Sequence, residues 1–524
     1  MTAGSPADGS EAGRITQPLR LSDRLRPFEF SGRSYFHTSA VPLTYLAASP
    51  GLSNLLKEFA HPRRLSDVVG AGLSRPAAYF FSLLCRTGVL VDASSPDPVH
   101  ALPCRTLHRQ SLLLYPTTRC NLKCIYCYAD SGPGAGLRMS RTRAIRAVDA
   151  FFHSLHEPVK TVQLSFHGGG EPTSNFAVMA AAWQRFRDCA RQRGIAPSAY
   201  TITNGMFSAR VLRALLEPEW RVAVSYDGPC QETQRPTASG RNSRTRVVAN
   251  LRALLKAGKR VATRATVTRS GVGRLRDLVE DAAELGIHHV QVEGAGLGGR
   301  GAGLIDGPPD PTDFAEAFLD AFGYALRNGV RLSTSAWSHT RVGDGRFCGA
   351  QTGLRAVTPD GFLSACPEAG SGPPSDNPFL VGRCRADGSM ETWPDREAHL
   401  QSRSGYALPA CRECFMVDTC AGGCASRARA CSGDPLARDE SRCTVARIIN
   451  ARLMADIADG QLLPDIGWQP MEATLTEANS PRPGACGRIV ALVPPHARCQ
   501  WNSDAGRRPA FPLPQDAPLF FHLP

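Results

Sequence analysis

Three cysteines with the spacing C-x3-C-x2-C lie in the first third of the chain, at Cys120, Cys124 and Cys127. An apolar, strand-like stretch from Leu112 to Tyr115 precedes them, so we expect the cysteines on a loop just past a strand end. A cubane iron–sulfur cluster takes one thiolate per iron, so three thiolates from one short loop leave the fourth iron open. Such cysteine pairs also occur in zinc sites and redox dithiols, and the run alone leaves these alternatives open.

Strand-like and helix-like stretches alternate after the cysteine run, a pattern typical of parallel βα units. One helical stretch begins after Ser140, which we predict as an N-cap, and another ends at Gly258. Besides the strand before the cysteines, the pattern predicts strands at 161–166, 199–203, 221–226, 260–268 and 288–293. Since parallel βα units close toward a barrel, we expect the functional residues at the C-terminal strand ends.

The run from Thr117 to Tyr128 resembles the cysteine loop of the radical S-adenosylmethionine (SAM) enzymes. In that family three thiolates hold a 4Fe-4S cluster, and the methionine part of SAM binds the open iron. The resemblance places Cys120, Cys124 and Cys127 on the cluster and Tyr126 near the adenine of SAM. It also implies an α/β fold built on a partial six-unit (β/α) barrel, which agrees with the number of expected strands.

Motifs at the expected strand ends resemble the SAM-binding positions of the same family. After the second strand, Gly169 and Gly170 let the backbone approach a ligand, and Glu171 offers an acceptor to the SAM amino group. The resemblance implies ribose contacts at the ends of the third and fourth strands and a pairing of Arg264 with the SAM carboxylate; the residues are Thr203, Asn204, Ser225, Asp227 and Arg264. Taken singly, a glycine run is commonly a turn and Arg264 an ordinary ion pair.

Seven further cysteines resemble the SPASM extension of this family, which binds two auxiliary iron–sulfur clusters, expected here as 4Fe-4S. The resemblance implies one set made of Cys348, Cys366 and Cys424, and a second set made of Cys411, Cys414, Cys420 and Cys443. Two zinc knuckles are the alternative, which fits the Cys411–Cys414 spacing and leaves the interleaved partners unexplained.

The first set departs from the SPASM pattern. Several relatives have one more cysteine shortly before the first of the seven, whereas the nearest upstream cysteine here is Cys230. The first auxiliary cluster is therefore expected to have three protein thiolates, unless Cys384 or Cys431 completes it. We hypothesise that an open iron there binds a substrate thiolate or amide.

Ahead of the barrel, residues 28–91 resemble the winged-helix elements that hold leader peptides in ribosomal peptide pathways, where the leader adds a strand to a β-ribbon. Ser34 to His37 predicts the ribbon, and helices at 52–59, 65–71 and 75–84 and a strand at 88–91 are expected to follow. A purely structural cap is the alternative. Near the other end a helix is expected at 446–459, and eleven prolines from Pro464 onward predict a partly ordered tail.

These patterns divide the chain into six segments. We expect a disordered N-terminus (1–27), a winged-helix-like peptide-recognition or cap domain (28–105), the radical SAM partial barrel (106–300), a connecting helix and strand (301–347), the SPASM domain (348–459) and a Pro-rich tail (460–524).

Composition bears on location and partners. Eighteen cysteines without a secretory signal or an apolar run of membrane-spanning length predict a reducing, cytoplasmic setting and no membrane partner. The net charge of +13 is spread along the chain without an aromatic-interleaved motif, so we expect no nucleic-acid partner. A solvated basic surface and attraction for an acidic peptide both explain this charge.

The resemblance implies an enzyme that cleaves SAM to a 5′-deoxyadenosyl radical and oxidatively modifies a ribosomal peptide or protein, forming a crosslink, thioether or related bond. Its partners would be the precursor peptide and a one-electron reductant of the flavodoxin or ferredoxin type. One alternative is formylglycine formation, but the maturases that perform it place an Asp directly after the cysteine matching Cys366, where this chain has Pro367 and then Glu368.

Glu368 is the candidate general base, against the commoner fate of a surface carboxylate. Two readings from other classes stay open on the sequence: an iron–sulfur electron-transfer protein without SAM turnover, and a zinc-dependent nucleic-acid binder.

Overall fold

The computed structural model describes residues 17–38, 43–70, 72–94, 109–134, 136–155, 159–337, 345–370, 372–385, 387–462 and 469–493. The expected disorder at 1–16 and the tail from 494 onward lie outside these ranges. Within them, no helix has the length and apolar character needed to cross a membrane.

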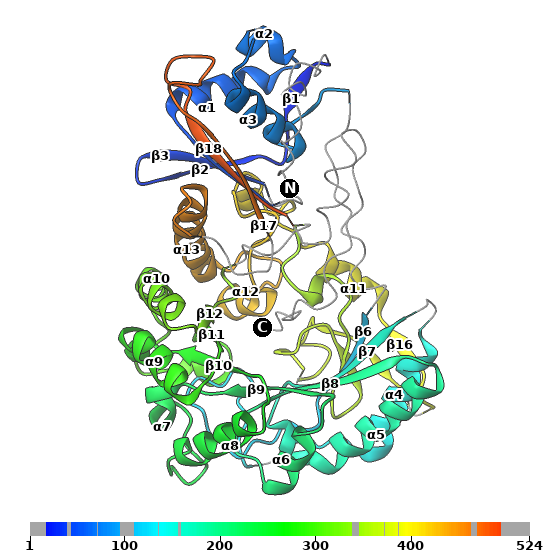
Figure 1. The fold of residues 1–524 in the computed structure, drawn as a ribbon. Helices are drawn as coiled ribbons and strands as arrows, with labels where there is room; N and C mark the ends of the chain where they lie inside the picture. The colour runs from blue at the N-terminus through cyan, green and yellow to red at the C-terminus, as the bar shows by residue number, and fades with distance from the viewer. Residues whose placement is uncertain are drawn as a thin grey trace, which may run out of the picture.

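An 11-stranded sheet crosses the lower half of the molecule in the view of Figure 1. Its strands β6 to β12 run parallel to their neighbours in chain order. Their bounds are β6 Arg109–Leu114, β7 Thr161–Phe166, β8 Ala196–Thr203, β9 Trp220–Ser225, β10 Val261–Val267, β11 His289–Gly294 and β12 Arg331–Ser333. The six predicted strands are confirmed, with small shifts at their ends. The mixed α/β fold with a large parallel sheet is therefore as expected.

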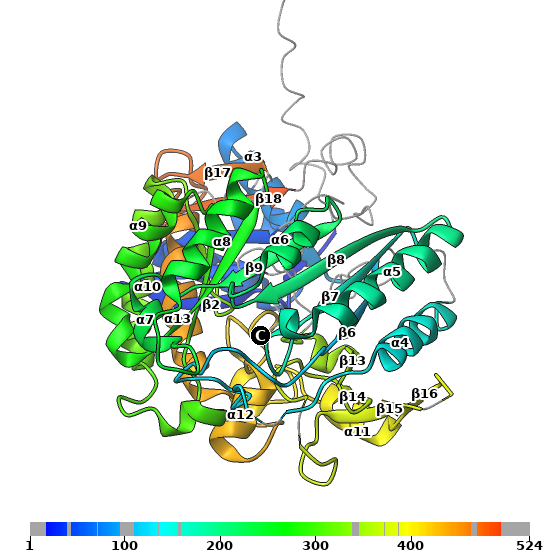
Figure 2. The same cartoon turned by 90° about the horizontal axis from the view of Figure 1, so that it is seen from below.

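Helices connect the parallel strands and lie along one side of the sheet, while the C-terminal segments lie on the other (Figures 1 and 2). The connecting helices are α4 Arg141–His153, α5 Phe176–Gln192, α6 Ala209–Leu215, α7 Gln231–Gln234, α8 Arg244–Lys256, α9 Leu275–Leu285 and α10 Pro311–Arg327. Ser140 caps α4 as predicted, since its side chain accepts from Arg143 N. The helix and strand found between residues 301 and 347 are α10 and β12.

A second sheet has the order β17-β18-β4-β3-β2 and combines both ends of the chain. The expected ribbon is β2 Arg26–Phe30, β3 Arg33–Thr38 and β4 Leu43–Ala48, followed by α1 Pro50–Lys57, α2 Leu65–Val69, α3 Arg75–Arg86 and β5 Leu90–Asp92. The C-terminal strands are β17 Gln469–Leu475 and β18 Gly487–Val493, and β18 pairs with β4 over six residue pairs.

Two expectations about the chain ends are corrected here. Residues 17–27 are ordered, because β1 (Leu19–Leu21) pairs with β5 and Leu19 and Leu25 are buried in the core of this domain. The first part of the Pro-rich tail is a hairpin rather than a tail, because Ile489 is fully buried in the same core. Figure 1 shows this hairpin in orange beside the blue helices of the N-terminal domain.

The cysteine-rich segment continues the large sheet and then packs across it. Strands β13 Ala356–Val357, β14 Phe362–Ser364, β15 Leu380–Cys384 and β16 Met390–Thr392 extend the sheet beyond β6, and α11 Pro394–Gln401, α12 Ala425–Ser432 and α13 Glu440–Ala458 follow. Helix α13 starts six residues before the predicted 446, because the Asp439 side chain accepts from Arg442 N and caps it.

Candidate functional site

The loop with the first cysteine run leaves β6 and crosses the C-terminal ends of the parallel strands. Backbone contacts hold it: Cys120 N donates to Gly132 O (2.9 Å), and Ile125 N donates to Gln234 O (3.0 Å). Burial and the Glu171 carboxylate raise the pKa of Cys120 to about 12. Burial also raises the pKa of Cys124 to about 11, although the Arg235 charge lowers it.

Buried thiols with such pKa values stay protonated at neutral pH, so thiolate ligation there needs the positive charge of bound metal. Three half-buried thiols on one loop are the donor set that a 4Fe-4S cluster takes, and the residues fit that group. Among the described residues, no three or more histidine, cysteine, aspartate or glutamate side chains are arranged around a single metal ion.

Glu171, Thr203 and Asn204 come from different strand ends and lie together. Glu171 Oε1 accepts from Thr203 Oγ1 (2.7 Å), and Oε2 accepts from Asn204 N (2.7 Å). Burial raises the pKa of Glu171, while these hydrogen bonds and those from Thr173 act against that rise. The Asn204 side chain donates to Cys120 Sγ (3.6 Å), so this carboxylate network adjoins the cysteine loop. An ionised Glu171 retains acceptor capacity for an ammonium group.

The glycines before Glu171 pack against the cysteine loop. A Cβ at Gly170 would overlap the Arg119 carbonyl, and a Cβ at Gly169 would lie 3.3 Å from Thr117 O. Gly168 and Gly169 also have positive φ angles, 88° and 58°, which other residues rarely adopt. The sequence suggested that these glycines allow the backbone to approach a ligand. The structure adds a second role, because they let the loop after β7 and the cysteine loop come into backbone contact.

Tyr126 and Asp227 lie on the opposite side of the loop, joined by a hydrogen bond from the Tyr126 hydroxyl. The Asp227 carboxylate also pairs with Arg235 (2.9 Å) and accepts from Thr266 N (3.0 Å). The Arg235 guanidinium stands over the Tyr126 ring, 5.2 Å from its centroid. Because both carboxylate oxygens have protein partners and only 2% of the side chain is exposed, Asp227 supports the loop here rather than presenting a free carboxylate.

Arg264 on β10 and Glu368, which follows β14, belong to one group of interacting charges. Arg264 is paired in register with Ser225 of β9. After burial, its charge is the cause that lowers the pKa of His167, to about 3. Burial raises the pKa of Glu368, and the nearby charges of Arg427 and Arg264 lower it. Glu368 is half-buried among these charges, which differs from the exposed carboxylate weighed as its alternative.

The seven later cysteines fall into two neighbourhoods. Electrostatic interactions link Cys366 to Cys424 and Cys348, and they link Cys420 to Cys414, Cys443 and Cys411. Burial raises the pKa of Cys424 and of Cys420 to about 12, so these thiols too need bound metal to ionise at neutral pH. The chemistry and the grouping of these donors fit two clusters.

The other cysteines lie in different surroundings. The charged neighbours of Cys384 are Arg143, Arg146 and Asp387, and those of Cys431 are Asp439 and Arg427. Cys230 lies near Asp227 and Arg274. The groups that most affect the pKa of these three thiols are mainly arginines and aspartates, and completion of the Cys348, Cys366 and Cys424 set by Cys384 or Cys431 stays a prediction.

Comparison with known proteins identifies the domain that carries the first cysteine run. Residues 114–283 match the radical SAM superfamily model. These residues form a radical SAM domain. The chain is homologous to mycofactocin maturase MftC of Mycolicibacterium smegmatis, with 27% identity over 340 residues, 62% of this chain and 80% of that protein. MftC of Mycobacterium tuberculosis (strain H37Rv) is 25% identical over 342 residues, 62% of this chain and 81% of its own.

The chain also shares its fold with solved structures. AdoMet-bound native anSMEcpe aligns with a TM-score of 0.54 and 18% identity, over 67% of this chain and all of that one. The same protein with AdoMet and the Kp18Cys peptide aligns with a TM-score of 0.51 and 16% identity, over 67% of this chain and 99% of that one.

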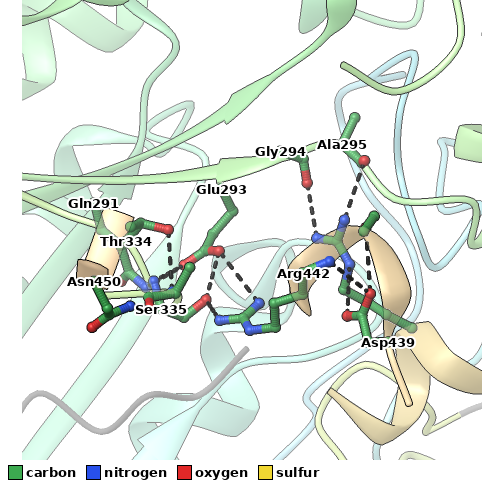
Figure 3. Close-up of polar contacts among 12 residues, drawn as sticks. Gln291, Glu293, Gly294, Ala295, Thr334, Ser335, Asp439, Arg442 and Asn450 are labelled. Carbon is green, nitrogen blue, oxygen red and sulfur yellow. Dashed lines mark hydrogen bonds and ion pairs between the residues drawn. The ribbon is translucent and has the colours of Figure 1, made fainter. Parts of the chain in front are cut away.

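The sequence analysis did not identify several charged residues near the candidate site. Arg235 and Arg300 lie outside the motifs, yet both contact the cysteine loop or its support. Glu293 and Arg442 lie where β11 meets the C-terminal helices (Figure 3). Arg427 contacts the end of the same strand, through Gly294 O. The one available signal was the glycine-rich run at 294–303, directly after a predicted strand.

Proposed function

We propose that this radical SAM enzyme cleaves SAM and uses the resulting radical to oxidise a carbon of a ribosomal peptide, forming a crosslink, thioether or related bond. The observation that carries the proposal is the homology to the mycofactocin maturases over 340 residues, about twice the length of the radical SAM match at 114–283. The similarity therefore includes segments beyond the SAM domain.

The chain's own residues would bind and orient SAM. Cys120, Cys124 and Cys127 would hold the 4Fe-4S cluster, which, when bound and reduced, supplies the electron for homolysis of SAM. Glu171 would accept from the SAM amino group, Arg264 would pair with its carboxylate, and Ser225 and Asn204 would contact the ribose. Asp227 would act on SAM through Tyr126, since its own oxygens are occupied.

The two later cysteine sets would hold auxiliary clusters. Their grouping by proximity, Cys348 with Cys366 and Cys424 and Cys411 with Cys414, Cys420 and Cys443, supports this assignment. Glu368 interacts electrostatically with Cys366, Tyr128 and Arg264. It would accept the proton released during substrate oxidation.

The substrate would be a peptide, and the N-terminal domain is the candidate for recognising its leader. If a leader adds a strand, it would do so at β2 or β17, because β18 already occupies the β4 edge. A precursor encoded beside this gene and a flavodoxin- or ferredoxin-type reductant would be the partners, in the cytoplasm.

The test is anaerobic reconstitution followed by iron and sulfide assay, SAM addition with a chemical reductant, and measurement of 5′-deoxyadenosine. We expect SAM cleavage, and a mass change in a peptide encoded beside the gene. Clusters without SAM cleavage would support the electron-transfer alternative, and zinc in place of iron would overturn the cluster assignments. Formylglycine in a neighbouring sulfatase would replace peptide crosslinking as the reaction.

A further inference from the structure

A glycine-rich segment, residues 294–303 (Gly294–Gly303), runs from the end of β11 onto the back of the cysteine loop. Gly299 has a positive φ of 53°, and a Cβ there would overlap the carbonyls of Cys127 and Tyr128. The next residue donates its backbone N–H to Cys127 O at 3.0 Å. Gly301 is buried, and a Cβ at that position would overlap Gly296 O. Glycine is therefore needed for this segment to fold on itself and to reach the loop.

Arg300 clamps the segment to the cysteine loop. Its Nε donates to Cys124 O (2.7 Å), Nη1 pairs with Asp130 (2.7 Å) and Nη2 donates to Ser131 O (2.8 Å). The planar guanidinium thus holds both sides of the loop at once, which a lysine ammonium cannot do with the same geometry. The Arg300 side chain is only 21% exposed, which limits competition from water.

Arg427 clamps the other end of the segment to the cysteine-rich domain. Figure 3 shows its partners Gly294, Ala295 and Asp439. Its guanidinium donates to Gly294 O (2.9 Å) and Ala295 O (3.4 Å), and it pairs with Asp439 at 3.6 Å. Arg427 is in the first turn of α12, whose N-cap is Cys424, and Asp439 caps α13, which carries Cys443. The segment is thereby tied to helices that bear cysteines of both later sets.

A second connection runs beside the first and fixes the end of β11. Glu293 accepts from Ser335 N (2.7 Å) and Ser335 Oγ (2.6 Å), and Arg442 of α13 lies 3.8 Å from its carboxylate and also contacts Ser335. Burial acts to raise the pKa of Glu293, but Arg442 and the serine hydrogen bonds outweigh it and hold that pKa below its ordinary value. Glu293 is therefore a carboxylate, and its pairing with Arg442 is ionic.

We infer that residues 294–303 are a positioning element that sets the geometry between the SAM-cluster loop and the helices bearing the later cysteines, with Arg300 and Arg427 as its two clamps. The role in catalysis rests on the proposed function, because the spacing of the clusters decides how well an electron leaves the substrate. Small displacements at a reacting centre cost rate steeply, by about 100-fold for 1 Å.

Hydrogen exchange in the full-length protein tests the mechanical part, and it needs no turnover. The variants are Arg427→Gln and Arg427→Lys, and the control is Arg185→Gln, which removes an ion pair with Asp149 on the outer helices α4 and α5. Arg427→Gln is expected to speed exchange at residues 117–134 by about tenfold, as loss of a hydrogen bond to a charged group permits. Arg427→Lys is expected to restore part of the protection, and the control none of the change.

A spectroscopic measurement tests the effect of the segment on the SAM cluster. Arg300→Gln is expected to alter the electron paramagnetic resonance spectrum of the reduced protein with SAM while iron content stays near the wild-type value. The inference is overturned if exchange in Arg427→Gln changes only within residues 425–445, or if Arg300→Gln has the wild-type spectrum.

If Arg427→Gln does not fold, exchange at 425–445 in Arg300→Gln decides the question in the reverse direction, and wild-type exchange there overturns the inference. A failure of SAM cleavage in wild-type protein with these exchange effects intact would count against the proposed function alone.

Discussion

The Asp227 carboxylate and the Arg235 guanidinium lie 2.9 Å apart behind the cysteine loop, with 2% and 9% of their side chains exposed. Burial acts to lower the pKa of Arg235, but the charge and hydrogen bond of Asp227, together with Tyr126 and Cys124, outweigh it and raise that pKa. Both residues contact Tyr126: its hydroxyl donates to the Asp227 carboxylate, and the Arg235 guanidinium lies over its ring. A buried ion pair therefore supports the aromatic residue of the SAM-binding loop.

Breaking this pair should be costly. Arg235→Gln leaves the Asp227 charge buried and unpaired, and we expect a loss of about 3–5 kcal/mol in the free energy of unfolding. Arg244→Gln, which removes a more exposed partner of Asp281, is the matched control and should cost about 1 kcal/mol or less. Chemical denaturation of the metal-free protein measures both values, and equal losses would contradict the assignment.

Close packing of Gly170 on the cysteine loop predicts a strong effect of one methyl group. Gly170→Ala would drive its Cβ into the Arg119 carbonyl, so the loop must shift, and we expect iron bound by Cys120, Cys124 and Cys127 to fall at least about threefold. Gly132→Ala lies in the same loop, where a Cβ meets open space, and should bind iron as the wild type does. Iron analysis after identical reconstitution compares the two, and equal retention would argue against the packing account.

His167 predicts a dependence of stability on acidity. Burial and the Arg264 charge lower its pKa to about 3, and one of its ring nitrogens, Nε2, is buried with no hydrogen-bond partner. Below pH about 6.5 the unfolded chain takes up a proton that the folded one refuses, so folded stability falls as pH drops from about 6.5 toward about 3. We expect His167→Gln to remove about 1.4 kcal/mol per pH unit from that slope. If the free energy of unfolding depends on pH with the same slope in the variant and the wild type, this prediction is wrong.

The two groups of later cysteines predict independent metal losses. Cys424→Ser should remove about four irons and leave the second set loaded, and Cys443→Ser should do the reverse. Cys189→Ser, at a buried thiol on α5 that faces Asp149, is the control and should lose none. Iron counting together with Mössbauer spectroscopy distinguishes the sets. Loss of all auxiliary iron from either variant would mean that the cysteines form one site.

The sequence predicted the parallel sheet well because its strands are short apolar runs separated by helices with clear periodicity and caps. Strand β7 was predicted at its observed bounds, and α4 begins where Ser140 indicated. The C-terminal hairpin was missed because prolines around it, from Pro464 to Pro495, obscure the strand pattern. The hairpin is stabilised by the pairing of β18 with β4, more than 400 residues away in the chain, and no local pattern reports such a partner.

The site divides in the same way. The spacing of Cys120, Cys124 and Cys127 was enough to predict them as cluster ligands, because the three thiols come from one short stretch of chain. The chain order of the strand-end motifs likewise brought Glu171, Thr203 and Asn204 to one edge, since parallel strands end together. Asp227 was expected to contact the ribose, but the structure shows its oxygens held by Tyr126, Arg235 and Thr266.

By itself, then, the sequence predicted the donor atoms and determined the alternation of strands and helices, both of which depend on residues close together in the chain. Tertiary structure alone decided the partners of the buried charges: Arg235 for Asp227, Arg300 for the cysteine loop and Arg442 for Glu293. The physical reason is that a buried charge needs a partner, and many arginines in this basic chain were available. Which one arrives depends on how distant segments pack.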